Sequence, residues 1–152
     1  MEQKSFVHYV TKIFVDVLFY GGILACCGIP WIVKWWVGTD AYRYLPSAAY
    51  PLSGILMASG LCAVYILFQL KKLFRTLLGG DPFVQANISC FRKMAVAAML
   101  IAVIYTGKCI WSFTFPSAIV VVVFVIASLF CLTLKDVFKQ AVYYKQEHDF
   151  TV

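Results

Sequence analysis

Residues that could take part in chemistry are few in this sequence. It contains two His and seven Asp or Glu residues among 152. The H-E-x-x-H zinc motif, the Gly-rich phosphate loop and the G-x-S-x-G nucleophile turn each need a fixed spacing of ligand, backbone or nucleophile, and none occurs. We therefore expect a protein that is not an enzyme and that uses no metal ion or cofactor.

The six cysteines form no recognisable metal or redox motif. They are Cys26, Cys27, Cys62, Cys90, Cys109 and Cys131. No C-x-x-C pair occurs among them, and no His stands at the spacing of a metal ligand. We interpret them as small apolar packing residues. A disulfide from Cys109 to Cys26 or Cys27 is the alternative.

One carboxylate, Asp16, interrupts the apolar run of residues 13–33. Intramembrane carboxylates are costly and usually face the interior of a helix bundle. Lys12 precedes Asp16 by one helical turn, so an i, i+4 pair would satisfy both charges. We favour this structural pair over a role for Asp16 in proton or ion handling.

The composition indicates that these residues sit in a membrane protein. Of all residues, 62% are apolar and 13% are charged, against about 45–50% and about 25% in soluble proteins. So few charges cannot cover a surface exposed to water. The length suits one compact unit, and four membrane spans with short connections would use nearly all of it.

Four apolar runs are long enough, at about 20 residues each, to cross a bilayer as helices. The predicted spans cover about residues 10–36, 48–77, 93–113 and 116–145. The third connection is so short that the last two spans must form an antiparallel hairpin. The predicted fold is therefore an all-α polytopic membrane protein, a single domain of four transmembrane helices in two antiparallel hairpins.

The distribution of basic residues predicts the orientation in the membrane. Ten of the 13 Lys and Arg residues flank the spans on one side, which carries both termini and the joint at 78–92. Basic residues are enriched on the cytoplasmic side. We therefore predict a multi-pass protein of the cell membrane with cytoplasmic N- and C-termini. The net charge of +6 then serves orientation, and we expect no direct binding of nucleic acid.

The joint at 78–92 contains strong helix-boundary signals. Gly79 and Gly80 are typical of a helix end, and Asp81 and Pro82 are typical of an N-cap and a first helical position. The apolar residues that follow are Phe83, Val84, Ile88 and Phe91. We predict a short cytoplasmic helix between spans two and three. It either serves only as a joint or docks a partner, and the capping signals do not separate the two.

The fourth span continues past the membrane as an amphipathic helix. Apolar residues at 134, 137, 138, 141 and 142 follow the i, i+3, i+4 rule. This face could pack on the predicted short helix, lie on lipid or meet a partner, and we favour internal packing. Within the membrane, close helix contacts are predicted at the small-residue pairs. These are Gly21/Ala25, Gly54/Ala58 and Ala98/Ala102.

The segment Gly79-Gly80-Asp81-Pro82-Phe83-Val84-Gln85-Ala86-Asn87, followed by Arg92-Lys93, resembles the signature of a bacterial four-span membrane family called domain of unknown function 2975. The C-terminal pattern is also similar: Val137-Phe138-Lys139-Gln140-Ala141, then Glu147, Asp149, Phe150, Thr151 and Val152. Phe150 stands where members have Leu, and His148 interrupts the acidic pair. The resemblance implies a bacterial cell-membrane protein, often encoded beside a small helix-turn-helix regulator, and carries over no catalytic residues.

These observations favour a non-enzymatic signalling or regulatory role through the cytoplasmic face. The candidate partner surface comprises Gly80, Asp81, Pro82, Phe83, Asn87, Arg92, Glu147, Asp149 and Thr151. The expected partners are the lipid bilayer, a small cytoplasmic helix-turn-helix regulator and further copies of the chain. One alternative is an oligomeric transporter or channel subunit with Asp16 on the route. Another is a binder of a lipid or apolar ligand between the spans.

Overall fold

The computed structural model describes the backbone of residues 2–37, 46–79 and 84–150, and the side chains of 9–35, 51–77, 79 and 84–148. Four helices and no strands occur in this part of the chain: α1 (Glu2–Val37), α2 (Pro46–Leu78), α3 (Gln85–Trp111) and α4 (Phe115–Phe150). All four are long and apolar enough to cross a membrane. The predictions of an all-α fold and of four spans are confirmed.

The helix ends follow from local sequence. α2 ends at the Gly79 turn, where the Gly79 amide donates to the Arg75 carbonyl at 3.2 Å. Pro116 lies in the first turn of α4, where its missing N–H leaves no hydrogen bond unmade. The α3–α4 connection is held by the Thr114 carbonyl, which accepts from the amides of Ser117 and Ala118.

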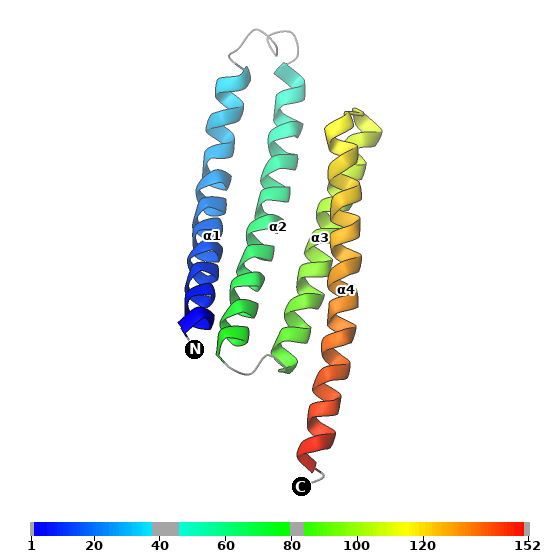
Figure 1. Cartoon of the computed structure of the whole chain (residues 1–152). Helices are drawn as coiled ribbons and strands as arrows, with labels where there is room; N and C mark the ends of the chain where they lie inside the picture. Colours follow the sequence, from blue (N-terminus) through cyan, green and yellow to red (C-terminus); the bar gives the residue numbers. More distant parts are fainter. Residues whose placement is uncertain (1, 38–45, 80–83, 151–152) are drawn as a thin grey trace.

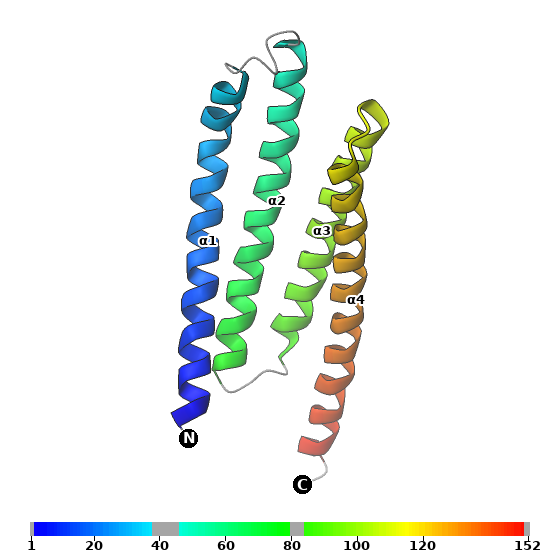
Figure 2. The ribbon, with the colours of Figure 1, turned by 45° about the horizontal axis from the view of Figure 1, so that its top comes forward.

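The helices form an open row in chain order (Figures 1 and 2). Consecutive helices run antiparallel, and each contacts the next. The α3–α4 contact is the most extensive, and among the described residues α4 contacts neither α1 nor α2. The predicted grouping into two hairpins is not confirmed, because α2 packs on α3 as well as on α1.

The predicted short helix between spans two and three is not seen. α3 begins at Gln85 and continues unbroken to Trp111, and its N-cap is Val84 in extended conformation without a side-chain cap. The reason is that residues 85–106 contain no Gly or Pro to end a helix. Arg92 and Lys93 are exposed within α3, so these charges do not mark a helix boundary.

The core is centred on α3, the most buried of the four spans. One stripe of buried residues, Phe91, Ala95, Ala98 and Ala102, faces α4. Evidence for this facing is the hydrogen bond of 2.9 Å from Ser128 Oγ to the Ala95 carbonyl. A second stripe comprises Asn87, Cys90, Met94, Ala97 and Ile101, of which Asn87 contacts Thr76 of α2. Small side chains allow the backbones of α3 and α4 to approach closely.

The small-residue prediction is partly right. Ala98 and Ala102 are buried, at 3% and 2% exposed. At Gly21 and Gly54, however, an added Cβ would meet nothing within 4 Å. The close α1–α2 contact uses Gly60 instead, where a Cβ would lie 2.7 Å from Cys26 Sγ. Spacing alone cannot tell which of several small residues faces the neighbouring helix.

This difference gives a matched pair of variants. Gly60→Val should destabilise the protein by about 1–3 kcal/mol, because the added methyl groups would overpack the α1–α2 contact. Gly54→Val makes the same change on the same helix in open space and should not. Unfolding titrations in mixed micelles measure both, and equal effects of the two substitutions would contradict the assigned contact.

Candidate functional site

The structure describes three side chains of the predicted partner surface, Asn87, Arg92 and Glu147. Five further members lie outside the described residues: Gly80, Asp81, Pro82, Phe83 and Thr151. For Asp149 the structure describes the backbone but not the side chain. The three described residues do not form one surface. Asn87 is buried, Arg92 is exposed on α3, and Glu147 is exposed near the end of α4.

Asn87 ties α3 to α2 at the start of the third span. It has no exposed surface, and its amide oxygen lies within hydrogen-bonding distance of Thr76 Oγ1. Thr76 Oγ1 also lies 2.8 Å from the Leu73 carbonyl. The Thr76 hydroxyl has one proton and can donate to only one of these two oxygens at a time. If the oxygen and nitrogen of the Asn87 side-chain amide trade places, the amide nitrogen donates to Thr76 Oγ1 while the Thr76 hydroxyl donates to the Leu73 carbonyl. In this position Asn87 contributes to the helix contact and is not available to a soluble partner.

Asp16 is paired, but not with Lys12. Its Oδ1 lies 2.7 Å from Lys71 Nζ, which joins α1 to α2. Lys71 Nζ also lies 5.3 Å from the ring centroid of Phe19 and 5.2 Å from that of Tyr20, within the range of cation–π contacts. The predicted partner was wrong because helical spacing identifies neighbours within one helix only. The Asp16–Lys71 pair neutralises both charges, whereas Lys12 is exposed on α1.

The two possible partners can be told apart by mutation. Asp16→Leu should lower the unfolding temperature by several degrees, because Lys71 is left without its counter-ion. The double variant Asp16→Leu/Lys71→Met should recover most of that loss, since it leaves no lone charge. Lys12→Met should change little. Thermal unfolding in detergent tests this, and rescue by Lys12→Met instead of Lys71→Met would contradict the observed pair.

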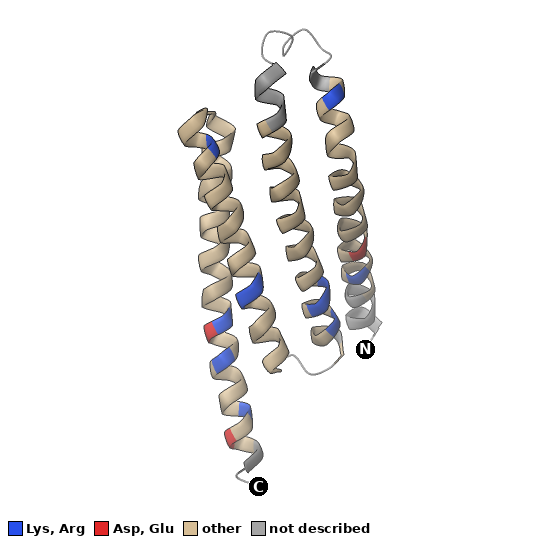
Figure 3. Ribbon diagram, turned by 180° about the vertical axis from the view of Figure 1, so that it is seen from behind, with Lys and Arg blue, Asp and Glu red and all other residues tan. Residues whose placement is uncertain are grey.

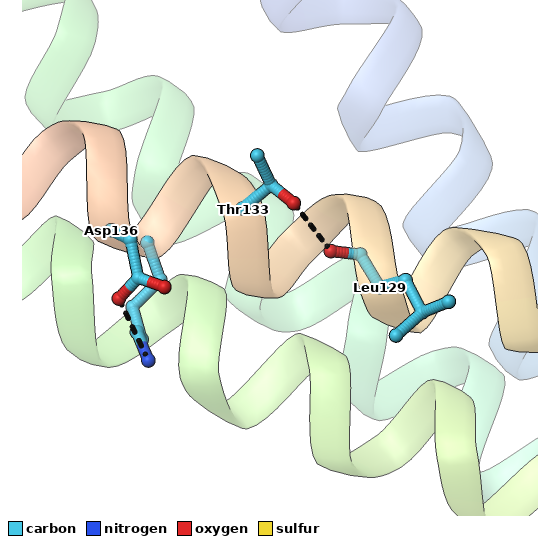
Figure 4. Close-up of polar contacts among 4 residues, drawn as sticks. Leu129, Thr133 and Asp136 are labelled. Carbon is cyan, nitrogen blue, oxygen red and sulfur yellow. Dashed lines mark hydrogen bonds and ion pairs between the residues drawn. The ribbon is translucent and has the colours of Figure 1, made fainter.

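The α4 extension packs inward on one side only. Phe138 meets Phe91 of α3 with ring centroids 5.0 Å apart, and Val142 is 4% exposed, so the predicted internal packing is confirmed for these two. Val137, Tyr143 and Tyr144 are exposed. Polar side chains nearer the N-terminus of α4 have partners on α4 itself. Thr133 Oγ1 donates to the Leu129 carbonyl, and Asp136 forms an ion pair with Lys135 (Figure 4).

A groove between α2 and α3 was not anticipated from the sequence. Its volume is about 440 Å³. It is lined by Leu61, Cys62, Tyr65, Arg92, Lys93, Val96, Ala97 and Leu100. We call it the α2–α3 groove. The sequence contains one signal of this groove: Arg92, Val96 and Leu100 follow one another at four-residue spacing, so one basic and two apolar side chains lie along the same face of the helix. The residues of α2 that face them could not be identified without the structure.

The described part of the chain contains neither a metal-binding cluster nor a disulfide. No group of three His, Cys, Asp or Glu residues is placed to hold a metal ion there. All six cysteines are free thiols. The alternative disulfide from Cys109 to Cys26 or Cys27 is not formed, and it would have to join α3 to α1, which are not in contact.

Comparison with known proteins gives one match. The model of a family described as "Protein of unknown function (DUF2975)" matches residues 12–152. No curated protein matches the chain, and no solved structure does. The match covers all four helices apart from the first residues of α1.

Proposed function

The chain belongs to the DUF2975 family of proteins of unknown function, and we propose that it is a non-enzymatic regulatory protein of the bacterial cell membrane. In this proposal its cytoplasmic end holds and releases a soluble partner. The observation that carries the proposal is the end of α4, which extends beyond the start of α3 and the end of α2 (Figure 1). That end exposes the aromatic side chains of Tyr143 and Tyr144, which a soluble partner could contact.

The orientation is part of the proposal, and the basic residues support it. Lys and Arg gather at the end of the molecule that carries both termini (Figure 3). Only Lys34 and Lys108 mark the opposite end among the described residues. Lys108 Nζ is held there by Ser117 Oγ at 2.6 Å and Thr114 Oγ1 at 3.2 Å. By the positive-inside rule we place the N- and C-termini in the cytoplasm.

The exposed face of the α4 end has the composition of a contact surface. Tyr143 and Tyr144 are 60% and 66% exposed, and their rings meet edge to face at 6.3 Å. Tyrosine is enriched at protein interfaces and often dominates their energy. Because Phe138 and Val142 anchor the opposite face, this pair is presented on a fixed helix. The resemblance of the sequence suggests a small helix-turn-helix regulator as the partner.

An ion-transport role has less support. The Asp16 carboxylate is neutralised by Lys71, and the open row of helices encloses no central path among the described residues. A channel would therefore require several copies of the chain. The regulatory proposal needs no such assembly.

Co-purification with a candidate small helix-turn-helix regulator tests the proposal. The purified membrane protein in detergent should retain it, and Tyr144→Ala should weaken retention at least tenfold, the effect of losing an aromatic anchor. Tyr9→Ala is the matched control, because Tyr9 is 65% exposed on the same predicted side of the membrane. Failure of the unmodified protein to retain the regulator, or equal retention by the Tyr144→Ala variant, would count against the proposal.

A further inference from the structure

We propose that the α2–α3 groove binds one anionic phospholipid, with the phosphate at Arg92 and Lys93 and an acyl chain along the apolar lining. This inference goes beyond the regulatory role of α4, because it concerns another pair of helices and another ligand. It depends on three features of the groove: its apolar wall, its two basic residues and their depth in the membrane.

The apolar wall faces the lipid. Leu61, Val96 and Leu100 are 62%, 56% and 50% exposed, on helices that are long and apolar enough to cross the membrane. Ala97, at 4% exposed, lines the groove with a single methyl group, which leaves the space between the larger side chains open. A groove of this kind in hydrocarbon is complementary to an extended acyl chain.

The charge of the groove is entirely positive. Arg92 and Lys93 line it, and no acidic side chain does. Within the described part of the chain neither has an ion-pair partner, whereas Lys71 and Lys135 each pair with an aspartate. Arg92 and Lys93 together can neutralise one phosphate, and the arginine can bind two of its oxygens. Basic pockets between transmembrane helices on the cytoplasmic side are typical sites for anionic headgroups.

The depth of the two ends fits a phospholipid. At 1.5 Å per residue, Lys93 lies about 22 Å along α3 from Lys108, whose amine is held in the α3–α4 turn. The hydrocarbon core is about 30 Å thick, so long basic side chains at position 92 or 93 reach the inner headgroups. Leu100 lies about 12 Å from Arg92 toward the centre of the membrane. The basic end and the apolar wall are therefore in the order of a headgroup and its chain.

Native mass spectrometry of the full chain in detergent tests the headgroup contact, with dioleoyl phosphatidylglycerol and dioleoyl phosphatidylcholine as probes. We expect one tightly bound phosphatidylglycerol and clear preference for it over phosphatidylcholine. Arg92→Gln/Lys93→Gln should weaken phosphatidylglycerol binding about 30-fold, on the scale by which each basic residue contributes near an anionic membrane surface. Lys72→Gln/Arg75→Gln removes the same charge from the exposed end of α2 and should leave the binding unchanged.

A second pair of variants tests the apolar wall without changing charge. Val96→Trp fills the groove and should lower phosphatidylglycerol binding at least tenfold. Val122→Trp makes the same change on α4 at a position 57% exposed, against 56% for Val96, and should not. Equal binding of the two phospholipids, or equal losses of binding in a variant and its control, would overturn the proposal. So would a dimer that binds no phosphatidylglycerol and that Val96→Trp converts to a monomer, because the groove would then be the contact with a second copy of the chain.

Discussion

Replacing Phe91 by Ala should destabilise the protein by about 3 kcal/mol, the cost typical of truncating a buried phenylalanine. Phe91 is 6% exposed, and its ring meets that of Phe138. A phenylalanine at this position that did not pack on α4 could lose its side chain at much smaller cost. Equilibrium unfolding in mixed micelles, followed by helical circular dichroism, gives the free energy directly.

The control is Phe130→Ala, because Phe130 is 62% exposed on α4 and should lose less than half as much. A double-mutant cycle of Phe91 and Phe138 should give a coupling of about 0.5–1.5 kcal/mol, the range for aromatic pairs. If Phe91→Ala costs no more than Phe130→Ala, the first turns of α3 do not pack on α4 as described.

Enlarging Ala98 to Phe should be at least as damaging, about 3 kcal/mol. Ala98 is 3% exposed and lies one turn beyond Ala95, whose carbonyl accepts the buried Ser128 hydroxyl. A ring at this position would separate α3 from α4 and break that hydrogen bond, so the strain of overpacking adds to an unsatisfied polar group. The same micelle titration measures the loss.

Val103→Phe provides the comparison for Ala98→Phe. Val103 lies on the same helix and is 60% exposed, so a ring there meets lipid and should be tolerated. Equal destabilisation by the two substitutions would show that the cost comes from the ring itself and not from the α3–α4 contact.

The number and type of the helices could be predicted because hydropathy acts on each segment separately. Each span has enough apolar residues to cross the bilayer alone, so no knowledge of its neighbours is needed. The start of α3 was predicted wrongly because the third span was expected to begin at about residue 93, beside the charges of Arg92 and Lys93, whereas α3 begins at Gln85. A helix continues through charges that can reach the headgroups, and only Gly or Pro would have interrupted it.

The contacts between helices could not be predicted in the same way. Asp16 has one candidate partner on its own helix and several on others, and the choice of Lys71 depends on how α1 lies against α2. The same applies to Gly60 and to the α2–α3 groove, each of which needs residues from two helices. Asn87 belongs to the sequence signature, but its burial beside Thr76 is a property of the packed pair.

The proposed cytoplasmic position of the basic end underlies both proposals, since the regulator and the inner-leaflet headgroup must reach it. Fusions of green fluorescent protein and of alkaline phosphatase to the C-terminus of the full chain test this position most directly. Green fluorescent protein fluoresces only when it folds in the cytoplasm, and the phosphatase is active only outside it. We predict a fluorescent first fusion and an inactive second one. A dark first fusion with an active phosphatase would place the end of α4 outside the cell and contradict the account.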